Sequence, residues 1–244
     1  MADVKSCFEA DGFVVVANLF TEPEVAQMKA EIRRILEDAR AQAVAAGHSA
    51  SDVARDGVFV GLAASSPFFR RLAQDARLLD PLEAILGPDL EFLSDKVVFK
   101  SAGVDYGSPW HQDWPYWEGA HKISIWVALD AATPENGCLK MLPGSHKHVA
   151  THDGTPLPGE GFGHRLRSDA VDESRAAILP AVPGDAIYFH DLTLHASFPN
   201  TTGQDRWAFI TTYRSAAEPD LDYGWAVARQ IVRSAGQARS DSGS

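Results

Sequence analysis

The stretch Trp110-His111-Gln112-Asp113-Trp114-Pro115-Tyr116-Trp117 holds an imidazole and a carboxylate two residues apart. In a β-strand, residues i and i+2 lie on the same face, so the side chains of His111 and Asp113 would converge on one point. With a third histidine from elsewhere they would form a two-histidine, one-carboxylate facial triad, which holds non-haem iron(II) and leaves coordination positions open. The stretch therefore predicts a metal site on a β-rich scaffold.

The histidine–carboxylate pair is by itself weak evidence for such a site. The chain has 9 histidines and 33 acidic residues among 244 positions. Chance alone then places an acidic residue two positions after a histidine about once. The sequence contains one such pair, so only its surroundings can support the interpretation.

Length and charge exclude several classes of protein. A chain of 244 residues, 45% of them hydrophobic, can bury a substantial core in one all-β domain. No apolar run approaches the length of a membrane-spanning helix, and the N-terminal residues lack the pattern of a signal peptide. The formal net charge of −11 argues against nucleic acid as a partner. We therefore expect a small-molecule partner and no membrane association.

The two cysteines, Cys7 and Cys138, are too few for a disulfide scaffold, and we expect a cytoplasmic location. The sequence contains no internal repeat and no interdomain linker. Residues 1–233 are therefore expected to form a single domain, and the polar tail at 234–244 is expected to be disordered. The oligomeric state is not indicated.

The first third of the chain is predicted to be largely helical. Thr21-Glu22-Pro23-Glu24 is a capping box, and apolar residues follow it at helical spacing. A buried strand is expected at 13–16, between the first two helices. Helices are expected at residues 4–11, 21–47, 66–72 and 81–86.

From Leu90 onward, short β-rich runs separated by turns dominate the sequence. In this part, strands are expected at residues 93–100, 123–129, 139–142, 186–189 and 207–213. A further short strand is expected in the first third, at 58–60. Several antiparallel strands after a helical first third indicate a mainly β fold with flanking helices, either a sandwich or a double-stranded barrel. Residues 150–177, rich in Gly and Pro, are expected to form a long irregular insertion of the kind that often covers an active site.

The second half of the chain offers two candidates for the third ligand. Gly184–Phe189 indicates a turn followed by a strand, after which come His190 and, five residues later, His195. On a regular strand these two histidines would face opposite sides. Taken alone, each would more often be a hydrogen-bonded structural residue, so the residues leave the choice open.

Several short motifs occur in a fixed order along the chain. They are Asp11-Gly12-Phe13-Val14-Val15, His111-Gln112-Asp113, Asn136-Gly137-Cys138-Leu139, Leu142-Pro143-Gly144-Ser145-His146, Gly184-Asp185, His195-Ala196-Ser197, Asn200 and Arg206. In order and spacing they resemble the phytanoyl-CoA dioxygenase family of iron(II)- and 2-oxoglutarate-dependent oxygenases, from about Phe8 to Arg214. The resemblance implies a double-stranded β-helix core (a jelly roll, cupin-like).

The same resemblance implies His111, Asp113 and His195 as the catalytic iron ligands. It implies Arg206 as the clamp for the distal carboxylate of 2-oxoglutarate, and a guanidinium offers a planar fork for two carboxylate oxygens. Further contacts with the cosubstrate or the substrate are expected from Ser197, Trp126, Gln112 and Lys96.

The activity implied is hydroxylation of an unactivated C–H bond of a small metabolite, with Fe(II), 2-oxoglutarate and O2 consumed and succinate and CO2 released. Related halogenases replace the carboxylate ligand with a small residue, so Asp113 makes halogenation improbable. Desaturation, epoxidation or ring closure by the same machinery stays open. Lys96 or Lys100 could pair with an acidic group, and no motif indicates a coenzyme A site.

Other functions also stay open at this point. A non-oxidative cupin-like metal enzyme or a zinc hydrolase could use the same three ligands but would not need Arg206, and a binding protein could have kept the scaffold without catalysis. A second histidine cluster, His146, His148 and His152, is not favoured as a metal site because nearby Pro and Gly argue against a helix. Four aromatic residues fit either the core or a substrate pocket: Trp110, Trp114, Tyr116 and Trp117.

Overall fold

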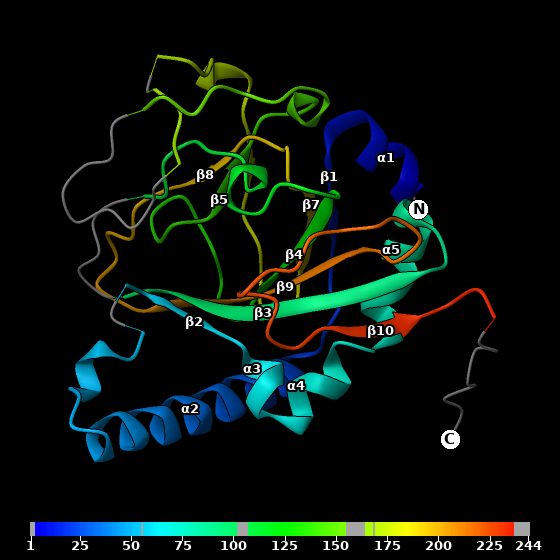
Figure 1. Ribbon diagram of the computed structural model, residues 1–244. Coiled ribbons are helices and arrows are strands. Elements are labelled where there is room, and N and C mark those ends of the chain that lie inside the picture. The colour runs from blue at the N-terminus through cyan, green and yellow to red at the C-terminus, as the bar shows by residue number, and fades with distance from the viewer. Residues whose placement is uncertain (1–2, 55, 102–106, 155–163, 168, 237–244) are drawn as a thin grey trace.

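The computed structural model describes residues 3–54, 56–101, 107–154, 164–167 and 169–236, and within them the strands form two antiparallel sheets (Figure 1). The strands are β1 (Phe13–Val16), β2 (Val58–Val60), β3 (Leu90–Lys100), β4 (Lys122–Ala128), β5 (Leu139–Met141), β6 (Ala177–Leu179), β7 (Ala186–His190), β8 (His195–Ser197), β9 (Arg206–Ser215) and β10 (Gln230–Arg233). The larger sheet has the order β1-β7-β4-β9-β3-β10, with β2 also paired to β3, and the smaller has the order β6-β5-β8.

Helices cover the outer face of the larger sheet. In Figure 1 the long helix α2 and the short helices α3 and α4 lie on the side of β3 away from β5 and β8. The α-helices are α1 (Val4–Asp11), α2 (Glu22–Ala45), α3 (Leu62–Ser65), α4 (Pro67–Leu72) and α5 (Ala76–Leu86).

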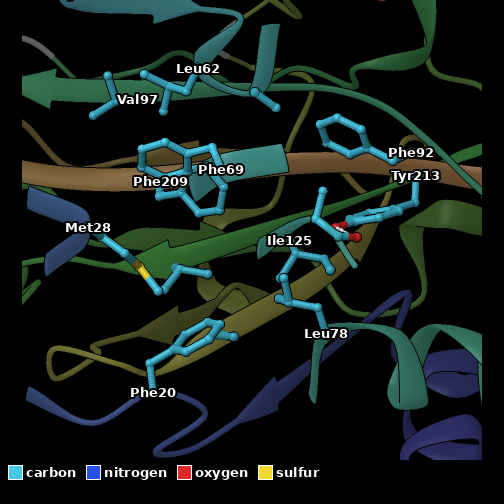
Figure 2. Packing of buried hydrophobic residues seen from close by; sticks show 14 of the residues in the cluster. Phe20, Met28, Leu62, Phe69, Leu78, Phe92, Val97, Ile125, Phe209 and Tyr213 are labelled. Carbon is cyan, nitrogen blue, oxygen red and sulfur yellow. Dashed lines mark hydrogen bonds between the residues drawn. The ribbon is translucent and has the colours of Figure 1, made fainter. Parts of the chain in front are cut away.

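The main hydrophobic core lies between these helices and the larger sheet. Met28 of α2 and Phe69 of α4 pack in one buried cluster with Val97 of β3 and Phe209 of β9, as Figure 2 shows. Because side chains alternate along a strand, the neighbouring residues point to the opposite face. Trp126 and Ile210, which pair across β4 and β9, lie on that inner face, between the two sheets.

The predicted mainly β fold with flanking helices and a jelly-roll core is confirmed. The capping box is present at the start of α2, where the backbone N–H of Thr21 donates to the Glu24 carboxylate over 2.8 Å. In the described part of the chain, no helix combines the length and apolar character that crossing a bilayer requires.

Two expected elements differ from the structure. The strand at 13–16 forms as β1, but it is the edge strand of its sheet and Val15 is 42% exposed, so the strand is not buried throughout. The helix expected at 81–86 begins five residues earlier, at Ala76, because Asp75 caps it by accepting the N–H of Arg77. The expected insertion at 150–177 lies in part, at 155–163 and 168, outside the described residues, as does the end of the expected tail, at 237–244.

Candidate metal centre

A backbone bridge brings His111 and His195 together. The N–H of His111 donates to the carbonyl of His195 over 3.1 Å, and the N–H of His195 donates to the carbonyl of His111 over 3.0 Å. Directly paired residues of an antiparallel bridge place their side chains on the same face, and the two ring centroids are 4.1 Å apart. The bridge therefore joins a segment after β3 to strand β8 at the position where both imidazoles point inward.

Asp113 completes a group of three possible ligand atoms. Its Oδ1 lies 3.7 Å from the Nε2 of His111 and 3.8 Å from the Nε2 of His195. Each of the three residues offers one atom within 4.8 Å of the other two. Both separations from Asp113 are below about 4.2 Å, twice a metal–nitrogen bond of about 2.1 Å, and the three residues together could hold a metal ion. The donor set, two imidazoles and one carboxylate, fits non-haem iron.

Backbone carbonyls fix the orientation of both rings. The Nδ1 of His111 lies 2.8 Å from the carbonyl oxygen of Pro109, and the Nδ1 of His195 lies 2.9 Å from that of Thr193. A carbonyl only accepts, so each Nδ1 carries the proton and each Nε2 keeps its lone pair for a metal. Burial, together with the positive charge that His195 carries when protonated, holds the pKa of His111 well below its ordinary value. The neutral, ligating form is therefore favoured at neutral pH.

Arg206, at the start of β9, is a buried cation with donors to spare. Its side chain is 2% exposed, and its Nη2 donates to the carbonyl of Gly137 over 2.6 Å. Among the described residues, no acceptor bonds to its Nε or Nη1. Burial lowers the pKa of Arg206 to about 10, so the guanidinium is still charged at neutral pH. A buried guanidinium with unused N–H donors fits a bound carboxylate.

Lys100 is a second cation beside Arg206. The two residues pair across β3 and β9, and burial and the neighbouring guanidinium lower the pKa of Lys100 to about 8. Gly137 makes room for Lys100: it has a φ of 99°, and a Cβ there would lie 2.3 Å from the Cδ of Lys100. The sequence drew attention to Lys100 only as a possible partner of an acidic substrate. Its pairing with Arg206 depends on strand register.

Strand β5 shows how the clamp is placed relative to the metal ligands. Along β5, Met141 pairs with His195 and Leu139 pairs with Ser197, and Gly137, just before the strand, accepts the bond from Arg206. Contacts with His195, Ser197 and Arg206 are therefore made in turn by residues 141, 139 and 137. Positions two residues apart on a strand are separated by about 7 Å.

The remaining expected contacts fall into two groups. Ser197, Trp126 and Lys96 lie on the inner side. The Ser197 hydroxyl accepts the N–H of Ser108 over 3.0 Å, the Trp126 ring centroid lies 5.5 Å from the Arg206 guanidinium, and the charge of Lys96 contributes to the lowered pKa of His111. The fully buried Gln112 differs from them: both N–H groups of its amide go to backbone carbonyls, those of His148 and Leu192. The geometry therefore does not support Gln112 as a cosubstrate contact.

The aromatic residues around the ligand pair also divide. Trp110 is 6% exposed and belongs to a buried cluster, whereas Tyr116 is 41% exposed and its ring lies edge-on to that of His111, with centroids 6.5 Å apart. Trp110 is thus a core residue, and Tyr116 lies at the rim of the candidate metal centre.

In the second histidine cluster, the Nε2 of His152 accepts the backbone N–H of Gln112.

His190, the rival third ligand, lies in a different group. With His121 and Asp191 it forms the second set of possible ligand atoms found among the described residues. The carboxylate of Asp191 lies 3.0 Å from an imidazole nitrogen of each histidine. Burial works to raise the pKa of Asp191, but the hydrogen bonds from His121 and His190 outweigh it and hold the pKa at about 2. The sequence analysis missed Asp191, and no local pattern marks it.

The fold and the donor set define the class of a jelly-roll protein with a candidate non-haem metal centre. The family described as phytanoyl-CoA dioxygenase (PhyH) matches residues 8–208. The chain belongs to this family, as the resemblance of its motifs implied.

Individual relatives agree with this assignment. L-proline trans-4-hydroxylase of Streptomyces griseoviridis is 27% identical over 237 residues, which cover 87% of this chain and 86% of the relative. The non-haem monooxygenase ThoJ is 28% identical, with a TM-score of 0.76 over 95% of this chain and 84% of that one. EvdO2 of Micromonospora carbonacea var. aurantiaca, solved with 2-oxoglutarate, is 25% identical, with a TM-score of 0.62 over 91% and 97% of the two chains.

Proposed function

We propose that this protein is an Fe(II)- and 2-oxoglutarate-dependent dioxygenase that hydroxylates a C–H bond of a small molecule and releases succinate and CO2. One observation carries the proposal: strand β5 pairs with the ligand His195 of the three-ligand group, and Gly137, two residues before β5, accepts a bond from the buried guanidinium of Arg206, whose Nε and Nη1 have no acceptor among the described residues. A non-oxidative metal enzyme would need the first feature but not the second. The family assignment and the relative solved with 2-oxoglutarate support the same function.

In this proposal His111, Asp113 and His195 hold the ferrous ion through Nε2, a carboxylate oxygen and Nε2. Bound iron with 2-oxoglutarate supplies the activation of O2 that the side chains themselves cannot provide. Asp113 gives the donor set its negative charge. The carbonyls of Pro109 and Thr193 keep both imidazoles in the tautomer that ligates.

The chain's other residues orient the cosubstrate. Arg206 binds its distal carboxylate with N–H donors that have no acceptor among the described residues, and Lys100 adds a second positive charge. Ser197 accepts one N–H and can still donate its own hydroxyl proton to the cosubstrate. Trp126 covers the guanidinium with an aromatic face and excludes water from that end. Tyr116, at the rim, is placed to contact the substrate.

The test is an anaerobic titration with Fe(II) and 2-oxoglutarate, monitored by the visible charge-transfer absorption of the iron chelate. The wild-type protein should give the band, and Zn(II) in place of Fe(II) should not. Two histidine variants form a matched pair: His195→Ala should lose the band, and His190→Ala should keep it. A folded, iron-loaded wild-type protein without the band, or loss of the band in His190→Ala alone, would contradict the proposal. Release of succinate across a set of candidate metabolites would then identify the substrate.

A further inference from the structure

The turn between β7 and β8 carries a fully buried carboxylate that the proposed reaction does not use. Asp191 is 0% exposed; it directly follows the last residue of β7 and precedes His195 by four residues. Its own N–H donates to the carbonyl of Lys122 over 3.0 Å. A buried carboxylate is costly unless hydrogen bonds satisfy it, so its partners indicate what it does.

The partners of Asp191 lie mostly in one segment, residues 113–122. At the start of that segment, the backbone carbonyl of Asp191 accepts the N–H of Asp113 over 2.8 Å and that of Trp114 over 3.1 Å. Further along, its carboxylate Oδ2 accepts the indole N–H of Trp117 over 3.0 Å and the backbone N–H of Lys122 over 2.9 Å. Asp191 therefore holds the segment at both ends.

This segment begins with the carboxylate of the metal centre. The backbone bridge between His111 and His195 fixes the two imidazoles relative to one another, but Asp113 lies two residues beyond that bridge. At that point the Asp191 carbonyl accepts the N–H groups of Asp113 and Trp114. These bonds hold the backbone at Asp113 against the turn that leads into His195, so the positions of all three ligands are fixed relative to one another.

We propose that Asp191 is a positioning residue that sets the Asp113 carboxylate in the metal-binding group. The inference rests on the proposed function only in taking Asp113 as a ligand. Removing the carboxylate of Asp191 leaves the N–H groups of Trp117 and Lys122 without their acceptor and frees the far end of the segment. The near end keeps its bonds to the backbone carbonyl of Asp191, but with the far end free the direction of the segment at Asp113 is fixed less firmly, and the metal is bound more weakly.

Asp185 provides a matched control at the other end of β7. It is also buried, at 8% exposure, and its carboxylate also accepts two N–H groups, in this case both from the backbone, those of Asn18 over 2.8 Å and Val182 over 3.0 Å. These bonds do not involve residues 111–113 or 195. Asp185→Ala therefore removes the same kind of buried anchor without touching the metal-binding segment.

The experiment measures the dissociation constant of Co(II) by calorimetry, and the thermal midpoint, for folded Asp191→Ala, Asp191→Asn and Asp185→Ala. Asp191→Ala should weaken Co(II) binding about ten- to a hundredfold, the usual effect of residues that orient metal ligands. Asp191→Asn should weaken it less, since one amide oxygen can still accept both N–H bonds. Asp185→Ala should lower the thermal midpoint but leave the dissociation constant of Co(II) within about twofold of wild type. This change is smaller than the loss of about tenfold or more expected for Asp191→Ala.

A double-mutant cycle with Asp113→Ala separates positioning from general loosening. If Asp191 acts through Asp113, adding Asp191→Ala to Asp113→Ala should cause little further loss of Co(II) affinity. Additive losses, equal losses in Asp185→Ala, or wild-type affinity in folded Asp191→Ala would each overturn the positioning role. Wild-type protein that binds no Co(II) would overturn the proposed function as well, so the two failures are distinguishable.

Discussion

The two ends of strand β9 bury the same side chain in opposite ways. Arg206 and Arg214 are eight residues apart and so share a face of the strand, and they are 2% and 7% exposed. Arg214 lies 2.5 Å from the carboxylate of Glu91 and donates to the carbonyls of Ser215 and Glu218 over 2.8 and 2.6 Å. Arg206 has one protein acceptor, the carbonyl of Gly137, among the described residues, and its neighbour Lys100 is another cation.

The difference separates a structural charge from a functional one. A buried charge is tolerated when a partner compensates its lost hydration. At Arg214 the protein supplies that partner itself, so the charge contributes to holding β9, β3 and the following segment together. At Arg206 the compensation is incomplete without an anion from outside. The same strand thus stabilises the fold at one end and prepares a carboxylate site at the other.

The largest effect is expected at the structural end. Arg214→Ala leaves Glu91 in the interior with Arg229, 2.9 Å away, as its one charged partner within the described part of the chain, and breaking a buried pair costs about 3–5 kcal/mol. We expect that loss in the free energy of unfolding, measured by urea denaturation. Arg34→Ala is the control: it removes an exposed arginine of α2 that pairs with Glu31 and Asp38, and the loss should be much smaller because solvent screens exposed pairs. Equal losses in the two variants would show that the Arg214 network is not structural.

The second largest effect is expected at the Arg206 end of β9, in the affinity for 2-oxoglutarate instead of the free energy of unfolding. Arg206→Ala should leave the free energy of unfolding of the ligand-free protein unchanged or raise it, because it removes an under-compensated buried charge. It should weaken 2-oxoglutarate binding by about 2–3 kcal/mol, or about 30- to 150-fold. Calorimetric titration in the presence of Co(II) measures this loss. Arg206→Lys should be intermediate because an ammonium lacks the planar fork. Unchanged 2-oxoglutarate affinity in Arg206→Ala would show that Arg206 does not bind the cosubstrate, and its role would then not differ from that of Arg214.

Sequence reasoning located the parts of this site that depend on local spacing. The capping box at Thr21 is a local hydrogen-bond pattern and was accessible from sequence. The spacing of His111 and Asp113 indicated that they converge, but the strand expected to align them is absent: His111 forms an isolated bridge, and Asp113 precedes a 3-10 helix with φ −77° and ψ −28°. The sequence predicts the start of α5 too late, because proline favours the first turn of a helix and Pro81 therefore marks a helix start. A cap at Asp75 moves the start upstream and places Pro81 inside the helix.

The roles that sequence reasoning missed depend on contacts between distant parts of the chain. Lys100 meets Arg206 only through the register of β3 with β9, and Asp191 meets Trp117 and Lys122 only once β7 and β4 are paired. Gln112 is a different case. It was expected as a contact of the cosubstrate or the substrate, but its amide donates to the carbonyls of His148 and Leu192, which are far from it in the sequence.

The smallest effect concerns Lys100 and depends on pH. Its pKa is about 8 in the folded protein and about 10.4 in an unfolded chain, so the unfolded chain binds more protons between these values. Stability therefore rises as pH increases from about 8 to about 10, and the penalty is present in full below about pH 8. Lys100→Met should remove this rise, which thermal midpoints at pH 7 and pH 9.5 would detect as a flatter profile than that of wild type.

The same substitution connects Lys100 to the functional end of β9. At pH 7, Lys100→Met should weaken 2-oxoglutarate binding about tenfold, or about 1.4 kcal/mol, and the difference from wild type should shrink above pH 8 as the wild-type lysine loses its charge. In Arg206→Ala the neighbouring guanidinium no longer lowers the pKa of Lys100, so the stability rise should begin at a higher pH. Identical pH profiles in wild type and Lys100→Met would mean that Lys100 does not share the cationic pocket of Arg206, and a single guanidinium would then account for the carboxylate site.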